Sequence, residues 1–263
     1  MEGVVEALNR ARTLSFGDIR TREGHHPDRV HRDDMFVDPF RGNDLPAVKL
    51  SSRRLKNQRV VAFDPKDRQT RAFDLLRNGL LAPVAPDATR IISVASPTHG
   101  CGTSVVAANL AFAIARKRQW RVLLATLDGM SPAFERLGLC VPEVHSSDAS
   151  GIEVGKVEVD DVLVHVGSFA HIAIREGCTA ARHALVSAWL DDVRHDCGPT
   201  IVVLDLPPLL TNDDSQAIAA RSDIALLVLG VGSSTVADLE ACRGSLTATP
   251  HQIVLNKARR HGL

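Results

Sequence analysis

A glycine-containing turn at 96–104 is the segment of this sequence best suited to bind an anion. Its residues read Ser-Pro-Thr-His-Gly-Cys-Gly-Thr-Ser, and they join an apolar run at 91–95 to an apolar helical pattern at 103–118. Where a strand turns through glycines into a helix, backbone N–H groups and the positive end of the helix dipole point at one place, which suits a phosphate group. The sequence therefore predicts a phosphate-binding loop.

The loop satisfies only part of the phosphate-loop pattern GxxxxGK[ST]. Gly102 takes the second glycine position, and Ser104 takes the position of the hydroxyl that binds magnesium. Pro97 stands at the first glycine position, and Thr103 stands where the lysine belongs. Taken alone, the motif favours an ordinary strand-to-helix turn, so the rest of the chain must decide. The residues expected around a bound phosphate are Gly100, Cys101, Gly102, Thr103 and Ser104.

Acidic residues stand at the ends of two later apolar runs. Asp128 follows the run at 122–126, and Asp205 closes the run at 201–205, ahead of Leu-Pro-Pro and, further on, Asp214. The carboxyl ends of parallel strands meet at one edge of a sheet, and such sheets bind their ligands there. We therefore expect Asp128 and Asp205 to lie at the same edge as the loop.

The elements that must position these residues are apolar strands that alternate with helices. We predict strands at 91–95, 122–126, 162–166, 201–204, 224–229 and 253–255, helices at 68–81, 103–118, 180–195 and 236–246, and a short extended piece at 59–63. Nearly continuous apolar strands between helices indicate a parallel sheet that is covered on both faces. The fold class predicted from the sequence is therefore α/β, with a doubly wound, mostly parallel sheet.

The N-terminal part of the chain has a different character. Residues 1–15 carry a short helical pattern, which fits either a solvated helix or a small docking helix. Residues 16–56 are polar and contain three prolines, and we expect a disordered linker there. Its basic end, 49–56, fits a solvated linker better than a contact with acidic lipid headgroups. We expect one folded domain over 57–263.

The composition excludes several classes of protein. The chain has 263 residues with 31 basic and 31 acidic side chains, so a strongly basic nucleic-acid binder is disfavoured. No apolar run approaches the roughly 20 residues of a membrane span, and the N-terminus has no signal-peptide core. Five scattered cysteines without zinc-type spacing are typical of reduced thiols in the cytoplasm. The chain contains no tyrosine, which excludes chemistry on a tyrosine of its own.

In this order, the features resemble the bacterial tyrosine kinases (BY-kinases), a family of P-loop proteins in the same branch as the MinD and ParA ATPases. The resemblance covers 55–257 and includes the helical stretch 70–78, Ala-Ala-Asn-Leu-Ala at 107–111 and Asp-Leu-Pro-Pro at 205–208. The start of the chain, 4–11, also looks like that of autokinases in exopolysaccharide gene clusters.

The resemblance implies a P-loop NTPase fold that binds ATP or ADP with Mg²⁺. It also implies a cytoplasmic component of exopolysaccharide or capsule biosynthesis and export. Its expected partner is a membrane-anchored polysaccharide co-polymerase, or chain-length protein, which would hold it at the inner membrane.

The resemblance also assigns roles to single residues. Asp128 and Asp205 match catalytic carboxylates, and together with Ser104 they match the magnesium ligands. Asn256 stands where the related ATPases contact the adenine, and Asp214 matches an acidic position after the paired prolines.

Three departures from the family pattern fall on the chemistry of phosphoryl transfer. Thr103 replaces the loop lysine, Thr126 replaces the first aspartate of an acidic pair, and Met130 replaces an arginine. Phosphoryl transfer depends almost wholly on positioned positive charge, and the loss of one such group costs about two to three powers of ten in rate. We therefore expect a pseudokinase with weak or no nucleotide turnover.

Two other functions stay open at this point. One is an active ATPase or kinase that phosphorylates another chain, with Lys117, Lys156 or a partner supplying the missing cation. The other is a MinD- or ParA-like positioning ATPase, which is disfavoured because the KGG signature of those proteins is missing.

Self-assembly of the chain also stays open. Many BY-kinases form rings through an acidic–basic–basic triplet on the helix before the first strand. Here the positions read Arg71, Asp74 and Arg77, with the first two charges exchanged. The exchanged pair fits either contacts between identical subunits or a solvated helix face.

Overall fold

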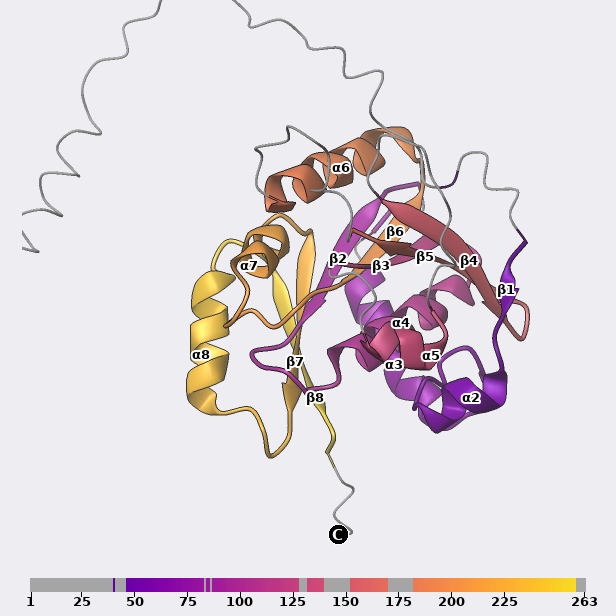
Figure 1. Cartoon of the computed structure of the whole chain (residues 1–263), viewed down its shortest axis with the longest axis horizontal. Helices are drawn as coiled ribbons and strands as arrows, with labels where there is room; N and C mark the ends of the chain where they lie inside the picture. Colours follow the sequence, from indigo (N-terminus) through magenta and orange to yellow (C-terminus); the bar gives the residue numbers. More distant parts are fainter. Residues whose placement is uncertain are drawn as a thin grey trace, which may run out of the picture. The chain divides into compact units, whose positions relative to one another are not determined.

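A sheet of eight strands lies at the centre of the fold, with helices on both of its faces (Figure 1). The computed structural model describes residues 40, 46–82, 84–85, 87–127, 132–139, 152–169 and 182–258. These residues belong to one unit that extends over Met35–Leu263. The helix predicted at 1–15 lies outside the described residues.

The sheet is parallel except at one pair of strands. Its spatial order is β1-β4-β5-β3-β6-β2-β7-β8, and only β4 and β5 run antiparallel. The strands are β1 (Val48–Lys49), β2 (Arg90–Ala95), β3 (Arg121–Thr126), β4 (Glu153–Val159), β5 (Val162–Ser168), β6 (Thr200–Asp205), β7 (Ile224–Gly230) and β8 (His251–Asn256).

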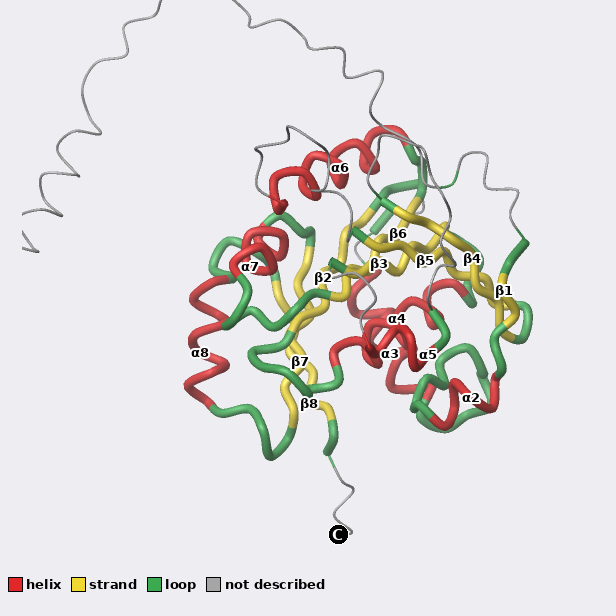
Figure 2. Tube along the Cα trace, in the orientation of Figure 1, coloured by secondary structure: helices red, strands yellow, loops and turns green. Residues whose placement is uncertain are grey.

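Helices cover the two faces of the sheet (Figure 2). They enclose two apolar core layers. The first layer lies between the sheet and α4, with α3 packed outside α4, and the second lies under α6, α7 and α8. The doubly wound α/β fold predicted from the sequence is thereby confirmed. The helices are α2 (Ser52–Asn57), α3 (Thr70–Leu81), α4 (Thr103–Ala115), α5 (Pro132–Leu137), α6 (Arg182–Asp196), α7 (Asp213–Ala220) and α8 (Val236–Ser245).

Helix α4 is the element that joins the phosphate loop to the core. Its residues from Val106 to Ala115 are all buried, and they are mostly alanine, leucine, isoleucine and phenylalanine. A helix that is apolar on every side is buried on every side, here between the sheet and α3. The loop at its N-terminus is therefore built on a rigid support.

The strands and helices predicted between 68 and 255 are present, with ends displaced by a few residues. The sequence did not predict β4, α5 or α7. In β4, valines alternate with charged residues and a glycine, so its apolar pattern is weak. The extended piece predicted at 59–63 is wrong, because those residues form turns ahead of α3.

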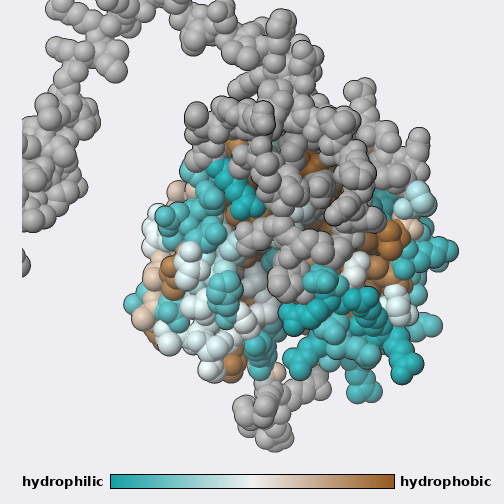
Figure 3. All heavy atoms as spheres, viewed as in Figure 1, coloured by the Kyte–Doolittle hydropathy of each residue, from teal (hydrophilic) through white to brown (hydrophobic). Residues whose placement is uncertain are grey.

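The folded part also begins earlier than the predicted linker boundary at residue 56. Strand β1 pairs with β4, and α2 places Leu55 in the first core layer with no exposed surface. The side chain of Arg54 donates to the carbonyl oxygens of Glu135 and Arg136 at 3.1 and 3.0 Å. Hydrophilic side chains gather on the molecular surface over α2 and its neighbours (Figure 3).

Candidate phosphate-binding site

The loop between β2 and α4 has the backbone conformation of an anion-binding turn. Gly100 and Gly102 have φ angles of 80° and 88°, which L-residues with a side chain rarely adopt. Gly102 also serves as the N-cap of α4. A Cβ atom at Gly102 would lie 2.3 Å from Nδ2 of Asn256, so both the conformation and the space require glycine there.

Unused backbone donors line this loop. Within the part of the chain that the structure describes, no N–H group of 99–102 donates a backbone hydrogen bond. Thr103 and Ser104 open α4, and the first N–H groups of a helix have no acceptor within it. The first described bond of this turn runs from the N–H of Val106 to the carbonyl of Gly102, at 3.1 Å. The loop therefore has backbone N–H groups free to donate, and phosphate binding at these residues stays a prediction.

The segment after Asp205 holds the start of the loop in place. The N–H of Leu206 donates to the carbonyl of Val94 at 3.0 Å, and that of Leu209 donates to Ser96 at 2.8 Å. The two prolines between them have no N–H to donate, and they leave those two bonds to the flanking leucines. The Asp-Leu-Pro-Pro element thus fixes Asp205 and the phosphate loop as neighbours.

Thr126 and Asp205 come together at the carboxyl edge of the sheet. They are partners in the β3–β6 register, and Asp205 is also the partner of Val94 in β2. Both side chains are buried, with 4% and 5% of their surface exposed. The edge therefore presents one carboxylate and one neutral hydroxyl where the family pattern has two carboxylates.

The predicted magnesium ligands are only partly described. Ser104 lies in the first turn of α4 and Asp205 ends β6, whereas Asp128 and Met130 lie outside the described residues. Among the residues that the structure does describe, no group of three or more His, Cys, Asp or Glu side chains could hold a metal ion. The metal site formed by Ser104, Asp128 and Asp205 stays a prediction.

Asn256 contacts the loop directly. Its Nδ2 donates to the carbonyl of Cys101 at 2.8 Å, and its Oδ1 accepts from the N–H of Lys257 at 2.9 Å. Its own carbonyl accepts from the N–H of Val231 at 3.0 Å. The side chain thus ties the end of β8 to the phosphate loop, a structural role that the sequence did not reveal. Its contact with an adenine stays a prediction.

The side chain of Cys101 faces the core and leaves only its backbone for the anion. The thiol is fully buried, and its Sγ lies 3.5 Å from Oγ of Ser234 and 3.9 Å from Oγ1 of Thr98. Burial by itself raises the pKa of this thiol, but hydrogen bonds from Ser234, the Gly230 N–H and Thr98 outweigh it and lower the pKa below its usual value. Cys242 lacks such donors, and burial raises its pKa to about 11.

Neither lysine considered as a substitute for the loop lysine lies at the loop. Lys117 follows the C-terminus of α4, and a helix of 13 residues is about 20 Å long. Lys156 lies in β4, which β5, β3 and β6 separate from β2. At a strand spacing of about 4.8 Å, those strands put it about 19 Å away.

Two basic residues that the sequence did not single out lie at the carboxyl edge. The Arg182 guanidinium donates to the carbonyl of Leu127, just after β3, and to that of Phe169 at 3.4 Å. His183 Nδ1 lies 2.9 Å from a carboxylate oxygen of Asp214. Both begin α6 and reach residues far away in the sequence, so no local pattern could have revealed these contacts.

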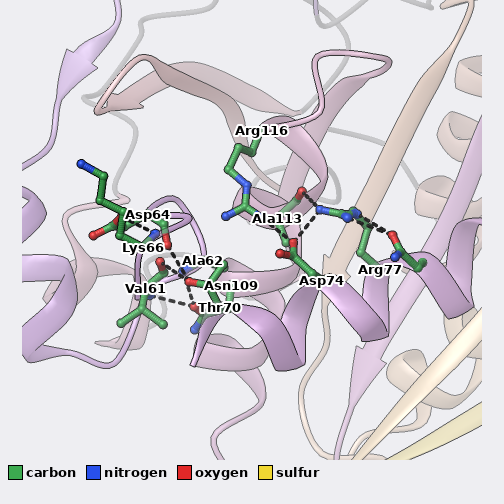
Figure 4. Close-up of polar contacts among 11 residues, drawn as sticks. Val61, Ala62, Asp64, Lys66, Thr70, Asp74, Arg77, Asn109, Ala113 and Arg116 are labelled. Carbon is green, nitrogen blue, oxygen red and sulfur yellow. Dashed lines mark hydrogen bonds and ion pairs between the residues drawn. The ribbon is translucent and has the colours of Figure 1, made fainter. Parts of the chain in front are cut away.

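The charged triplet on α3 is largely engaged within the chain (Figure 4). The carboxylate of Asp74 accepts from Arg77 at 2.7 Å and also binds Arg116 of α4. Arg77 is 5% exposed and donates to the carbonyl of Ala113 at 2.9 Å. Arg71 is exposed to solvent, Asp74 is half-buried and Arg77 is buried. Asp74 and Arg77 therefore bind α3 to α4.

Comparison with known proteins confirms the fold. No protein-family model matches the sequence, and no curated protein sequence matches it significantly. Among solved structures, the chimerical protein CapA2B2 is 19% identical, with a TM-score of 0.59 over 83% of this chain and 96% of that one.

Two further structures extend the comparison. The kinase domain of the Escherichia coli tyrosine kinase Etk is 17% identical, with a TM-score of 0.55 over 82% of this chain and 92% of that one. The Pyrococcus furiosus cell division ATPase MinD is 22% identical, with a TM-score of 0.51 over 65% and 73%. At the level of the fold, the resemblance to bacterial tyrosine kinases and MinD-like ATPases is confirmed.

Proposed function

We propose that this chain is a degenerate BY-kinase-like protein with weak or no nucleotide turnover. It would act in the cytoplasm as a component of exopolysaccharide or capsule biosynthesis or export, through a membrane-anchored co-polymerase. The observation that carries the proposal is a phosphate loop with its backbone donors in place but with Thr103 at the start of α4, where a kinase needs lysine. The fold shared with tyrosine kinase domains supports it.

The loss of charge affects catalysis more than binding. The backbone N–H groups of the loop and the helix N-terminus suit the phosphates of ATP or ADP in both ground state and product. Turnover needs further positive charge at the transferred phosphoryl group. With Thr103 and Thr126 both neutral, two independent losses of about two to three powers of ten each would leave little activity. Binding of Mg-nucleotide without turnover is the expected behaviour.

The absence of tyrosine supports the same conclusion. A chain with no tyrosine cannot phosphorylate its own tyrosines, so the substrate of autophosphorylation is missing together with much of the catalyst. Among the helices of the described residues, none is long and apolar enough to cross a membrane. In this proposal, contact with the membrane comes through the co-polymerase partner.

A second candidate function is an active ATPase or kinase that acts on another chain. The position of Lys257 favours it, because this exposed residue follows Asn256 directly and its N–H donates to the side chain that holds the loop. An extended lysine side chain at this position could supply the charge that Thr103 lacks. A MinD-like positioning ATPase would need the same substitute cation.

Two variants separate these functions. Titration calorimetry with Mg-ATP and Mg-ADP measures binding, and phosphate release together with transfer to a tyrosine-containing peptide measures turnover. We expect the wild-type chain to bind without measurable turnover, and Thr103→Lys with Thr126→Asp to gain hydrolysis. Wild-type hydrolysis as fast as that of the double variant would contradict the proposal. If Lys257→Ala then abolished that hydrolysis, the second function would be correct.

The role in polysaccharide biosynthesis needs a separate test. The co-polymerase whose gene lies nearest to the gene for this chain should keep the chain bound to membranes. Deletion of the gene for this chain should alter the length or amount of the polysaccharide. When the Thr103→Ala variant is expressed in the deletion strain, it should restore the wild-type polysaccharide if nucleotide turnover is dispensable. Failure of the deletion to change the polysaccharide would contradict this role.

A further inference from the structure

Strand β8 leaves one edge of the sheet open. It is the last strand in the spatial order, and within the described residues it pairs only with β7. Open edges in natural proteins usually carry lysine, proline or a bulge, which prevent another strand from adding to them. The sequence His-Gln-Ile-Val-Leu-Asn over β8 contains no proline and no acidic or lysine side chain. The edge is therefore free to accept a further strand.

The direction of the backbone groups defines which residues that strand would meet. The carbonyls of Pro250 and Asn256 accept from Ala225 and Val231, on the β7 side. Backbone groups alternate along a strand, so those of Gln252 and Val254 also point to β7. The N–H and C=O groups of Ile253 and Leu255 consequently point outward, to the open edge.

The same two residues carry the exposed apolar side chains of β8. Ile253 and Leu255 are 44% and 65% exposed, although their partners in β7, Leu227 and Leu229, are buried in the second core layer. Helix α8 packs on the second core layer, but these two side chains stay exposed to solvent. They extend the core layer to the edge of the sheet without a covering element in the described chain. Val231, which is 50% exposed, adjoins them at the end of β7.

We infer that β8 pairs with the β8 of a second copy of this chain, antiparallel and with Val254 opposite Val254. In this register, Ile253 of each copy lies opposite Leu255 of the other. The exposed apolar pair is thus complementary to itself under a two-fold axis. Ile253 and Leu255 also exchange backbone hydrogen bonds, because their N–H and C=O groups are those that face outward.

The neighbouring register is less favourable. If Ile253 lay opposite Ile253, both copies of Leu255 would lie opposite His251, and only the pair of Ile253 side chains would remain apolar. Lys257 has a φ angle of 63°, so the extended strand ends before it. The contact is therefore short, at or below the lower end of specific interfaces, which is about 1,200 Å². We expect a reversible dimer whose population rises with protein concentration.

Sedimentation of the full chain over a concentration series tests the dimer. Leu255→Lys should weaken association by about tenfold, because the two-fold dimer contains the pair of Ile253 and Leu255 twice and the substitution removes both. Leu163→Lys, on β5 far from the edge, is the matched control and should leave association unchanged; Leu163 is 41% exposed. Thermal unfolding of each variant checks that it folds.

A cysteine substitution tests the register. Residues 254 of the two copies would form a non-hydrogen-bonded pair with Cα atoms about 4.5 Å apart, which suits a disulfide. Val254→Cys should therefore cross-link under oxidised glutathione, whereas wild type, with its native cysteines, and Ile253→Cys should not. A chain that stays monomeric at every concentration would overturn the inference, even if another protein adds a strand to this edge. A dimer that is insensitive to Leu255→Lys, or that cross-links through Ile253→Cys, would overturn it as well.

Discussion

The buried side chain of Asn109 in α4 offers the sharpest test of how the loop is supported. Its Oδ1 accepts from the N–H groups of Val61 and Ala62 at 2.8 and 3.0 Å (Figure 4). Its Nδ2 donates to the carbonyls of Arg59 and Val105 at 2.9 and 2.8 Å. Every hydrogen-bonding position of the amide is used, in a side chain with no exposed surface. Asn109 therefore holds the turns before α3 against the middle of α4.

The cost of Asn109→Ala follows from these bonds. The substitution leaves two buried N–H groups without an acceptor, at about 1–3 kcal/mol each. It also leaves a small cavity, so we expect a loss of about 3–6 kcal/mol in the free energy of unfolding. That is a large part of the 5–15 kcal/mol typical of a domain. By contrast, Asn57→Ala at the exposed end of α2 should change stability by less than about 0.5 kcal/mol.

Urea unfolding followed by circular dichroism measures the free energy of unfolding of both variants. We expect Asn109→Ala to leave unchanged the slope of this free energy against urea concentration. Hydrogen exchange adds a local measurement, because the amides of Val61 and Ala62 should lose their protection in Asn109→Ala. A loss of less than about 1 kcal/mol would contradict this role of Asn109, since it would mean that water replaces the amide at no cost.

Three further perturbations follow from the described contacts. Gly102→Ala should destabilise the chain by at least about 1–2 kcal/mol, because of its left-handed backbone and its contact with Asn256, and should abolish phosphate binding by calorimetry. Asp74→Ala should cost about 1–3 kcal/mol in urea unfolding, since it leaves the nearly buried Arg77 without its carboxylate, and the partial exposure of Asp74 limits the loss. Hydrogen bonds from its capping partner hold the pKa of Asp238 below its ordinary value of 3.8. The contribution of Asp238 to α8 is thus complete above that value and lost as the pH falls through the folded pKa, which amide chemical shifts would follow. If the amide chemical shifts at the N-terminus of α8 stayed unchanged down to the pH at which the chain unfolds, the role given to Asp238 would be wrong.

The α3 network changes the expectation about assembly. From the sequence, the charges of Arg71, Asp74 and Arg77 fitted either contacts between identical subunits or a solvated helix face. The structure commits Asp74 and Arg77 to Arg116 and to the backbone of α4 within one chain. Separating those charges from their partners would cost more free energy than an exposed ion pair between subunits would contribute. The open edge of β8 is therefore a better surface for self-association than this face of α3.

Local sequence patterns were enough to predict the fold class and the position of the candidate site. Apolar runs at 91–95, 122–126 and 201–204 predicted parallel strands, because a strand buried on both faces has no polar side to show. The turn at 96–104 and Asp205 then had to meet at the carboxyl edge. These are local patterns, and the structure reproduces them.

Which polar side chains are engaged in contacts within the fold became clear from the packing of the elements. The amides of Asn109 and Asn256, the charges of Asp74 and Arg77, and the thiol of Cys101 all bind residues that are distant in the sequence or buried by the packing. Such contacts depend on how strands and helices are brought together. A sequence pattern identifies a polar residue on an element, but its partner appears only when a second element packs against it.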